Sequence, residues 1–251
     1  MAEPANRAAG DEPRSPWLRT GFVLAAAFLG FVAVGGGFVA LTAGDPGGNG
    51  PAAVQAAAHG AAPAPAVRTG DRDPCPRLKD RSQSVPTSAP AGVTWSLYGS
   101  VALPSSTGSG PAEVDGDVAR CYAHTPVGAL LATGQISVRY LAAHDWRTVA
   151  RTQLVGAGRD AYVAGRTAAE KTAPPDQDPA AFGQIAGFDF VSYAADAAEI
   201  ETVWRFPDGR MQGATTTVRW QDGDWRLDFP ADPPAPVPVD SLAGHTPWAG
   251  V

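Results

Sequence analysis

The residues that point to definite chemistry in this 251-residue chain are its two cysteines, Cys75 and Cys121. An even cysteine count in an oxidising compartment favours pairing. A bridge would close a loop of about 47 residues and stabilise the fold by about 4 kcal/mol on the chain-entropy model. Two separate buried thiols are the alternative. The sequence favours the disulfide, which makes Cys75 the practical start of ordered structure.

Motifs for catalysis or nucleotide binding are missing from the sequence: it contains no HExxH, CxxC, P-loop or GxSxG pattern. Residues 156–161, GAGRDA, match the loose G-x-G-x-x-A dinucleotide pattern. Asp176 and Asp178 are the acidic residues at the distance where a ribose-binding residue is expected, but they lie in a proline-rich loop. The sequence around residues 156–161 also shows no convincing βαβ unit. We therefore interpret 156–161 as a turn between helices, and we predict no catalytic, cofactor-binding or metal-ligating residues and no cofactor.

A predicted membrane anchor decides in which compartment the two cysteines lie. Residues 21–43 contain no charged residue, Asn, Gln, His or Pro. A helix of that length is roughly 34 Å long, which matches a hydrocarbon core of about 30 Å. Three arginines, Arg7, Arg14 and Arg19, precede this stretch, and no Lys or Arg follows it before Arg68. Because basic residues stay on the cytoplasmic side, the N-terminus is predicted to be cytoplasmic and the rest extracytoplasmic.

A cleaved signal peptide is the alternative reading of this stretch, because residues 41–43, LTA, resemble a cleavage site. The apolar region of a signal peptide is usually about 7 to 15 residues long, and this one is longer. The sequence therefore favours an uncleaved, single-pass anchor in the cell membrane.

The remaining chain divides by composition. We expect a cytoplasmic tail at 1–20, the transmembrane helix at 21–43, a Pro/Ala/Gly-rich linker at 44–90, an extracytoplasmic domain at 91–230 and a Pro-rich C-terminal tail at 231–251. Such a linker cannot bury enough apolar surface to offset its ordering entropy. The C-terminal tail favours extended polyproline geometry. Three outcomes are left open: Trp248 docks the tail onto the domain, it docks the tail onto a partner, or the tail is disordered.

The domain begins with strand and helix signals. Apolar residues alternate over 93–97, which predicts a half-buried strand followed by a loop. Thr125 and Pro126 suit the cap and first turn of a helix over 126–143. Shorter helices are predicted over 146–154 and 160–171.

From Phe182 the period changes to two. Four strands are predicted around residues 188–191, 199–206, 216–220 and 225–229, with one aromatic and one charged face. Asp222-Gly223 marks the last hairpin. Helices followed by an antiparallel meander indicate the α+β class, with helices packed on one side of a curved antiparallel sheet.

Gly92 to Phe229 resembles the nuclear-transport-factor-like (cystatin-like) cone, and the closing hairpin VRWQDGDWRLDF looks like the end of such domains. The segments GVTWSLYGSVALPSSTGSGP and YAHTPVGALLATGQISVRY are similar to actinobacterial single-anchor proteins with an uncharacterised extracytoplasmic domain. The anchor-plus-cone arrangement also resembles VirB-type assembly factors of conjugation and secretion. These resemblances imply a fold and transfer no functional residue.

Enzymes with a cone fold usually hold an Asp or His in the pocket as general base. Asp189 and His124 are the two candidates for that role. The alternative for Asp189 is a solvated position on the outer face, and for His124 a capping or packed side chain. We favour these structural roles, and we assign His144 to an interhelical turn and His245 to the tail.

The expected function is a non-enzymatic, membrane-anchored scaffold or assembly subunit, with membrane-complex proteins or further copies of itself as partners. A small-ligand binding module is the alternative, and a cone-type lyase or isomerase is a third. The net charge of −6 and pI of about 5.1 offer no basic surface for nucleic acid. A ligand module should have a deep pocket with convergent polar groups, whereas an assembly subunit should have a filled cone and an exposed patch.

Overall fold

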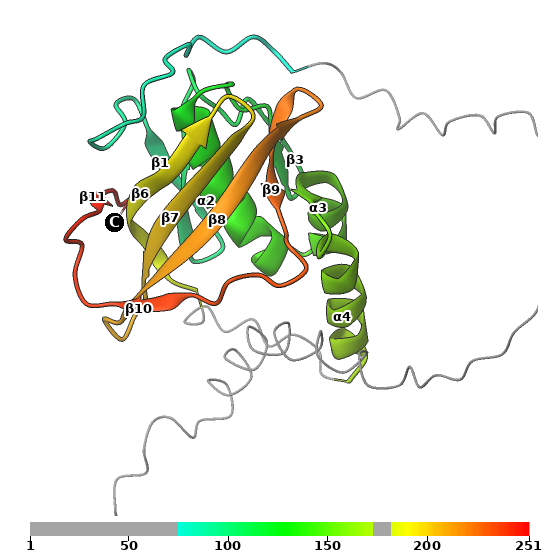
Figure 1. The fold of residues 1–251 in the computed structure, drawn as a ribbon. Coiled ribbons are helices and arrows are strands. Elements are labelled where there is room, and N and C mark those ends of the chain that lie inside the picture. The colour runs from blue at the N-terminus through cyan, green and yellow to red at the C-terminus, as the bar shows by residue number, and fades with distance from the viewer. Residues whose placement is uncertain (1–74, 173–181, 251) are drawn as a thin grey trace, which may run out of the picture.

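The computed structural model describes residues 75–172 and 182–250. The predicted cytoplasmic tail, the membrane span at 21–43 and most of the linker lie outside these residues. Within them, no helix has both the length and the apolar character needed to cross a membrane. The described part is a mixed α and β structure in which three helices accompany sheets that are mostly antiparallel (Figure 1).

An antiparallel meander forms the centre of the fold. Its strands are β6 (Gln184–Ala194), β7 (Ala197–Arg205), β8 (Met211–Gln221) and β9 (Asp224–Asp228), each paired with the next. Between β8 and β9 the chain turns at Asp222 and Gly223, which both have positive φ, 53° and 79°. Two positive φ values in succession are what a type I′ hairpin requires. The predicted four-strand meander is confirmed.

The three predicted helices are also confirmed, each to within one residue at its ends. They are α2 (Pro126–Ala142), α3 (Trp146–Gln153) and α4 (Arg159–Thr172). Thr125 caps α2 by accepting a hydrogen bond from the Gly128 N–H at 3.1 Å. Helix α2 crosses behind the meander, α3 lies beside β9, and α4 packs against α3 (Figure 1).

The sheet and α2 enclose one continuous core. Side chains at alternate positions of the meander point toward α2, as the period-two pattern predicted. The fully buried members from both layers include Leu130, Ile136, Phe188, Ile200, Val218 and Trp225. The space between the sheet and α2 is therefore filled by aromatic and aliphatic side chains.

The N-terminal part of the domain holds strands that the sequence did not reveal. The predicted strand at 93–97 is β1 (Thr94–Tyr98); Val93 and Trp95 are half-buried, as the alternation predicted, but Leu97 is 72% exposed. The following stretch, predicted as a loop, is the buried strand β2 (Val101–Ser105), which packs on α2 and β6. Two short strands, β3 (Glu113–Asp115) and β4 (Val118–Arg120), form a further hairpin.

The C-terminal segment lies on the domain. Strand β10 (Val237–Val239) pairs with β8, and β11 (Thr246–Pro247) pairs with the outer edge of β6. Trp248 is buried, and its backbone N–H donates to the Ala186 carbonyl at 3.0 Å. The question left open by the sequence is therefore answered in favour of docking.

A disulfide joins Cys75 to Cys121, with Cα atoms 5.3 Å apart, and confirms the predicted pairing. Cys121 has a φ of 70°, a backbone conformation that side-chain-bearing residues rarely adopt. The Asp224 carboxylate accepts hydrogen bonds from the Cys121 and Tyr122 N–H groups at 2.7 and 2.9 Å. Asp224 therefore joins the disulfide region to the last hairpin of the sheet.

Candidate functional site

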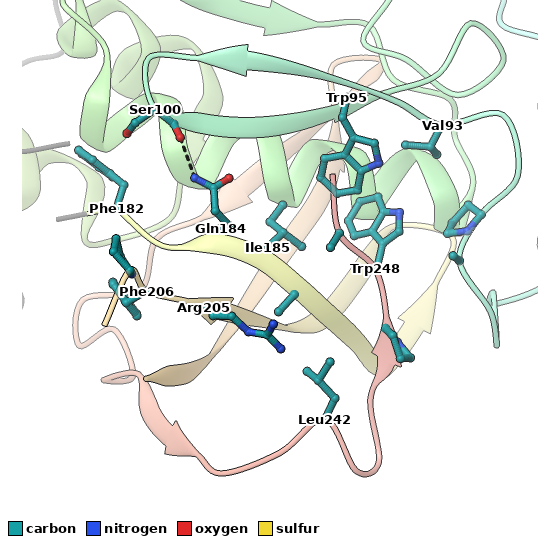
Figure 2. Close-up of a pocket in the computed structure, with 16 residues that line it drawn as sticks. Val93, Trp95, Ser100, Phe182, Gln184, Ile185, Arg205, Phe206, Leu242 and Trp248 are labelled. Carbon is teal, nitrogen blue, oxygen red and sulfur yellow. Dashed lines mark hydrogen bonds between the residues drawn. The ribbon is translucent and has the colours of Figure 1, made fainter. Parts of the chain in front are cut away.

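An open groove of about 930 Å³ runs between the β1–β2 hairpin, the start of β6 and the C-terminal segment (Figure 2). Its walls come from four separated parts of the chain. Apolar and aromatic side chains dominate the lining, among them Val93, Trp95, Phe182, Ile185, Phe206 and Trp248. Apolar concave surfaces of this kind are common binding sites.

Two tryptophans form the most distinctive wall of the groove. The rings of Trp95 and Trp248 are 4.8 Å apart, and Trp248 also meets Phe188 edge-on at 5.5 Å. Gly250 lies against the Trp95 ring so closely that an added Cβ would be 2.5 Å from it. Neither indole N–H donates to an acceptor anywhere in 75–172 or 182–250. The groove therefore offers two hydrogen-bond donors set in an apolar surface.

Arg205, at the end of β7, is the one charged side chain among the lining residues. It is exposed, and its recorded polar contact is a 3.7 Å approach to the Met211 sulfur. The other long polar side chain, Gln184, bonds the Ser100 carbonyl at 2.7 Å and the Ala102 N–H at 2.9 Å. Gln184 thus holds β2 against β6, while Arg205 can meet an anionic group on a bound molecule.

The two candidates for a general base lie away from this groove. The His124 ring stacks on Trp220 with centroids 4.0 Å apart, and its Nε2 contacts the Ala195 carbonyl. Asp189 is exposed on β6 and lies opposite Glu201 of β7. Neither side chain lines the groove. Their positions match the structural roles favoured by the sequence, with His124 packed and Asp189 solvated.

The two other histidines of the described part lie in the turn and tail to which they were assigned. His144 follows α2 in the turn before α3. His245, in the C-terminal segment, places its Nε2 3.1 Å from the Glu201 carboxylate. This contact ties the segment to the outer face of β7.

The glycine pattern at 156–161 has a packing explanation. A two-residue strand, β5 (Leu154–Val155), precedes it, so our interpretation as a turn between two helices is corrected to a strand-to-helix turn. A Cβ on Gly158 would collide with the Pro230 carbonyl, and the Gly158 N–H already donates to the Phe229 carbonyl at 2.9 Å. The absence of a side chain at these glycines therefore lets the chain that follows β9 pack closely against them. The Gly158 N–H, which could otherwise bind a phosphate, is already hydrogen-bonded.

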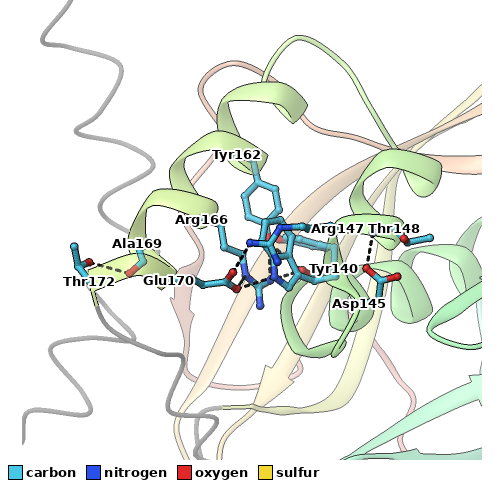
Figure 3. A network of polar contacts seen from close by, with 10 residues as sticks. Tyr140, Asp145, Arg147, Thr148, Tyr162, Arg166, Ala169, Glu170 and Thr172 are labelled. Carbon is cyan, nitrogen blue, oxygen red and sulfur yellow. Dashed lines mark hydrogen bonds and ion pairs between the residues drawn. The ribbon is translucent and has the colours of Figure 1, made fainter.

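A cluster of charged and aromatic side chains joins α3 to α4 (Figure 3). Glu170 accepts hydrogen bonds from the Trp146 indole and from Arg147, both at 2.7 Å. The Arg147 and Arg166 guanidinium carbons lie 4.5 and 4.3 Å from the Trp146 ring. Each charge has a partner, which indicates a structural role.

The same cluster reaches α2 through Tyr140. The Tyr162 hydroxyl donates to the Tyr140 carbonyl at 2.8 Å, and Arg166 donates to the Tyr162 oxygen at 2.9 Å. Burial raises the pKa of Tyr162 to about 12, against a smaller lowering by Arg166. The phenol therefore stays protonated and holds α4 to the body of the domain.

The sulfur atoms of Cys75 and Cys121 and the Asp224 carboxylate lie within 4.8 Å of one another. This spacing fits a metal site only for free thiolates, and the two sulfurs are bonded to each other. Burial raises the pKa of Asp224, although three backbone N–H groups oppose this shift. The cluster is a covalent and hydrogen-bonded link.

Residues 53–247 match the sequence model of a protein family described as "Domain of unknown function (DUF8175)". The chain belongs to the DUF8175 family. The DUF8175 match includes the meander, all three helices and β11, and it ends one residue before Trp248, so the groove lining falls within the match except for Trp248 and Ala249. Comparison with curated proteins and with solved structures finds no significant match.

Proposed function

We propose that this DUF8175 domain is a membrane-tethered, extracytoplasmic assembly subunit that binds other proteins through the groove between β1, β6 and the C-terminal segment. The observation that carries the proposal is the groove lining, which contains Trp95, Trp248 and Phe206 and a single charged group, Arg205. Aromatic residues and arginine are the side chains most enriched at protein interaction hot spots. An open, aromatic surface suits a segment of another protein.

The chemistry of the lining favours binding over catalysis. A guanidinium group remains protonated throughout the physiological range, so Arg205 cannot serve as a general base. Its charge can orient a carboxylate on a bound molecule. In the proposed role, the apolar walls supply affinity and Arg205 supplies orientation.

The proposed location outside the cytoplasm is supported by the Cys75–Cys121 disulfide. Disulfides persist in oxidising compartments and are rare in the cytosol. The anchor at 21–43, the N-terminus inside the cell and a role in a conjugation or secretion apparatus remain parts of the proposal. Three helices before an antiparallel meander, with α2 against one face, support a cone-like architecture.

A small-ligand binding module is the second candidate function. The groove volume of about 930 Å³ falls within the range of about 300–1,000 Å³ that is usual for ligand pockets. An apolar molecule with one carboxylate would match the aromatic walls and Arg205. Native mass spectrometry of the protein purified from its own membranes separates the two candidates, because a resident ligand adds a small fixed mass.

The proposal is tested by capture of membrane partners with full-length protein that carries Arg205→Glu. Arg151→Glu on α3 is the matched control, since it makes the same charge change at an exposed site that does not line the groove. We expect Arg205→Glu to lose partners that the control retains. Deleting residues 21–43 should also abolish cellular function, because tethering raises the local concentration of weak contacts. Equal partner recovery from both arginine variants would contradict the proposal.

A further inference from the structure

We propose that the groove binds residues 230–238 of a second copy of this chain. The inference rests on the proposed function, which it deepens by naming the partner. This segment reads PADPPAPVP, with proline at five of its nine positions. Both the groove and the segment lie on the described surface of the same molecule, so a second copy can supply what the first one recognises.

The segment is already ordered as a binding ridge. Its exposure repeats every three residues: Pro233, Pro236 and Val239 are half-buried, and the positions between them are exposed. A period of three is that of the polyproline II helix. The side chains turned to solvent include Pro234, Val237 and Asp232, and Val237 is 53% exposed. A preformed ridge loses little conformational entropy on binding.

The groove complements such a ridge in shape and hydrogen bonding. Polyproline segments bind in grooves lined by aromatic side chains, where proline rings pack on the aromatic faces. The backbone carbonyls of a polyproline segment make no internal hydrogen bonds and need outside donors. Val237 and Pro238 already pair with β8 as part of β10, so the carbonyls that need donors are those of residues 230–236. The indole N–H groups of Trp95 and Trp248, which have no acceptor among the described residues, are suitable donors.

Charge complementarity supports the same pairing. Asp232 is exposed on the ridge, and neither it nor Arg205 forms an ion pair within the described residues. A carboxylate near Arg205 can form a charge-assisted hydrogen bond with the guanidinium group. The ridge would thus be bound by aromatic packing and oriented by the Asp232–Arg205 contact.

The ridge cannot reach the groove of its own chain. At its start, the Phe229 N–H donates to the Val155 carbonyl at 2.7 Å and the Gly158 N–H donates to the Phe229 carbonyl. At its end, β10 is paired with β8. Figure 1 shows β10 at the end of β8 that is remote from β9, while β11 lies at the opposite edge beside β6. Binding between different surfaces of two copies is heterologous, which produces rings or linear arrays.

The test uses full-length protein in detergent, at low concentration, and a labelled synthetic peptide of residues 229–240. Fluorescence anisotropy should show saturable binding to the native protein. We expect Arg205→Glu in the protein or Asp232→Lys in the peptide to weaken binding about tenfold or more, and the two changes together to restore it. Asp240→Lys in the peptide is the matched control and should change binding less than about twofold, because Asp240 lies outside the ridge.

Variants that lose binding must keep the native melting temperature, so a folding defect is distinguished from a lost contact. The proposal is overturned if the 229–240 peptide does not bind, or if it binds equally well to the Arg205→Glu protein. Binding of a peptide of residues 59–74 in its place would assign the groove to the chain's own linker. If Arg205→Glu loses membrane partners but the 229–240 peptide does not bind, the proposed function stands and this inference fails.

Discussion

Replacing Asp224 with alanine should destabilise the domain more than any other single carboxylate change in the last hairpin. The substitution removes the acceptor for the Cys121 and Tyr122 N–H groups, at 2.7 and 2.9 Å, and for that of the neighbouring Trp225, at 3.0 Å. The two long-range hydrogen bonds to this charged group contribute about 3 to 6 kcal/mol in total. Burial raises the pKa of Asp224, which shows that its charge is costly to bury and offsets part of that gain. We expect a net loss of about 2 to 3 kcal/mol.

Thermal and urea unfolding followed by circular dichroism measure this loss. For a domain of this size, 2 to 3 kcal/mol corresponds to a fall in melting temperature of roughly 4 to 12 °C. Asp222→Asn is the matched control: its carboxylate is 71% exposed, 3.3 Å from Arg226, and asparagine tolerates the positive φ at this position. Equal stability of the Asp224→Ala and Asp222→Asn variants would refute the role assigned to Asp224.

Three further predictions concern stability. Replacing both Cys75 and Cys121 by serine should cost about 4 kcal/mol and lower the melting temperature by roughly 8 to 16 °C, whereas an unchanged melting curve would contradict the loop-closure argument. Burial raises the pKa of Tyr162 to about 12, so its protonated hydroxyl should contribute about 3 kcal/mol to the free energy of unfolding below pH 10. This contribution should be lost as the pH rises through 12. Unfolding of wild type and Tyr162→Phe across this alkaline range checks the prediction, and identical pH profiles would contradict it. Glu170→Ala should lower the free energy of unfolding by about 3 kcal/mol, because it removes the carboxylate that pairs with the buried Arg166. Amide hydrogen exchange should then rise first in α4, and protection of α4 equal to that of wild type would contradict this.

Much of the fold could be predicted from local patterns. Thr125 and Pro126 marked the start of α2, and Asp222-Gly223 marked the last hairpin, since each signal depends on backbone chemistry within a few residues. Strand β2 could not be recognised, because it is buried without alternation and contains Pro104. Its environment comes from α2 and β6, which are distant in the sequence. The exposure of Leu97 could not be predicted either, because it has the same alternation as the half-buried Val93 and Trp95, and only packing by other elements distinguishes the three positions.

The candidate site was harder to predict than the core. Trp248 drew attention as a tryptophan near a chain terminus, and it does pack against Trp95 and Phe188. Arg205 gave no signal, because it alternates with apolar residues like any solvent-facing residue of a strand. The groove forms where four segments of the chain come together through tertiary packing. The hydrophobic periodicity within one segment does not indicate which other segments pack beside it.

Site-specific photo-crosslinking in cells tests the central claim most directly. A photoreactive residue would replace Arg205 in the full-length protein, and a second variant would carry it at Thr215, an exposed position of β8 that does not line the groove. We predict crosslinks to protein, including adducts of two copies of this chain, from position 205 and none from position 215. Crosslinks from position 215 alone, or only to small molecules from position 205, would contradict an assembly role for this groove.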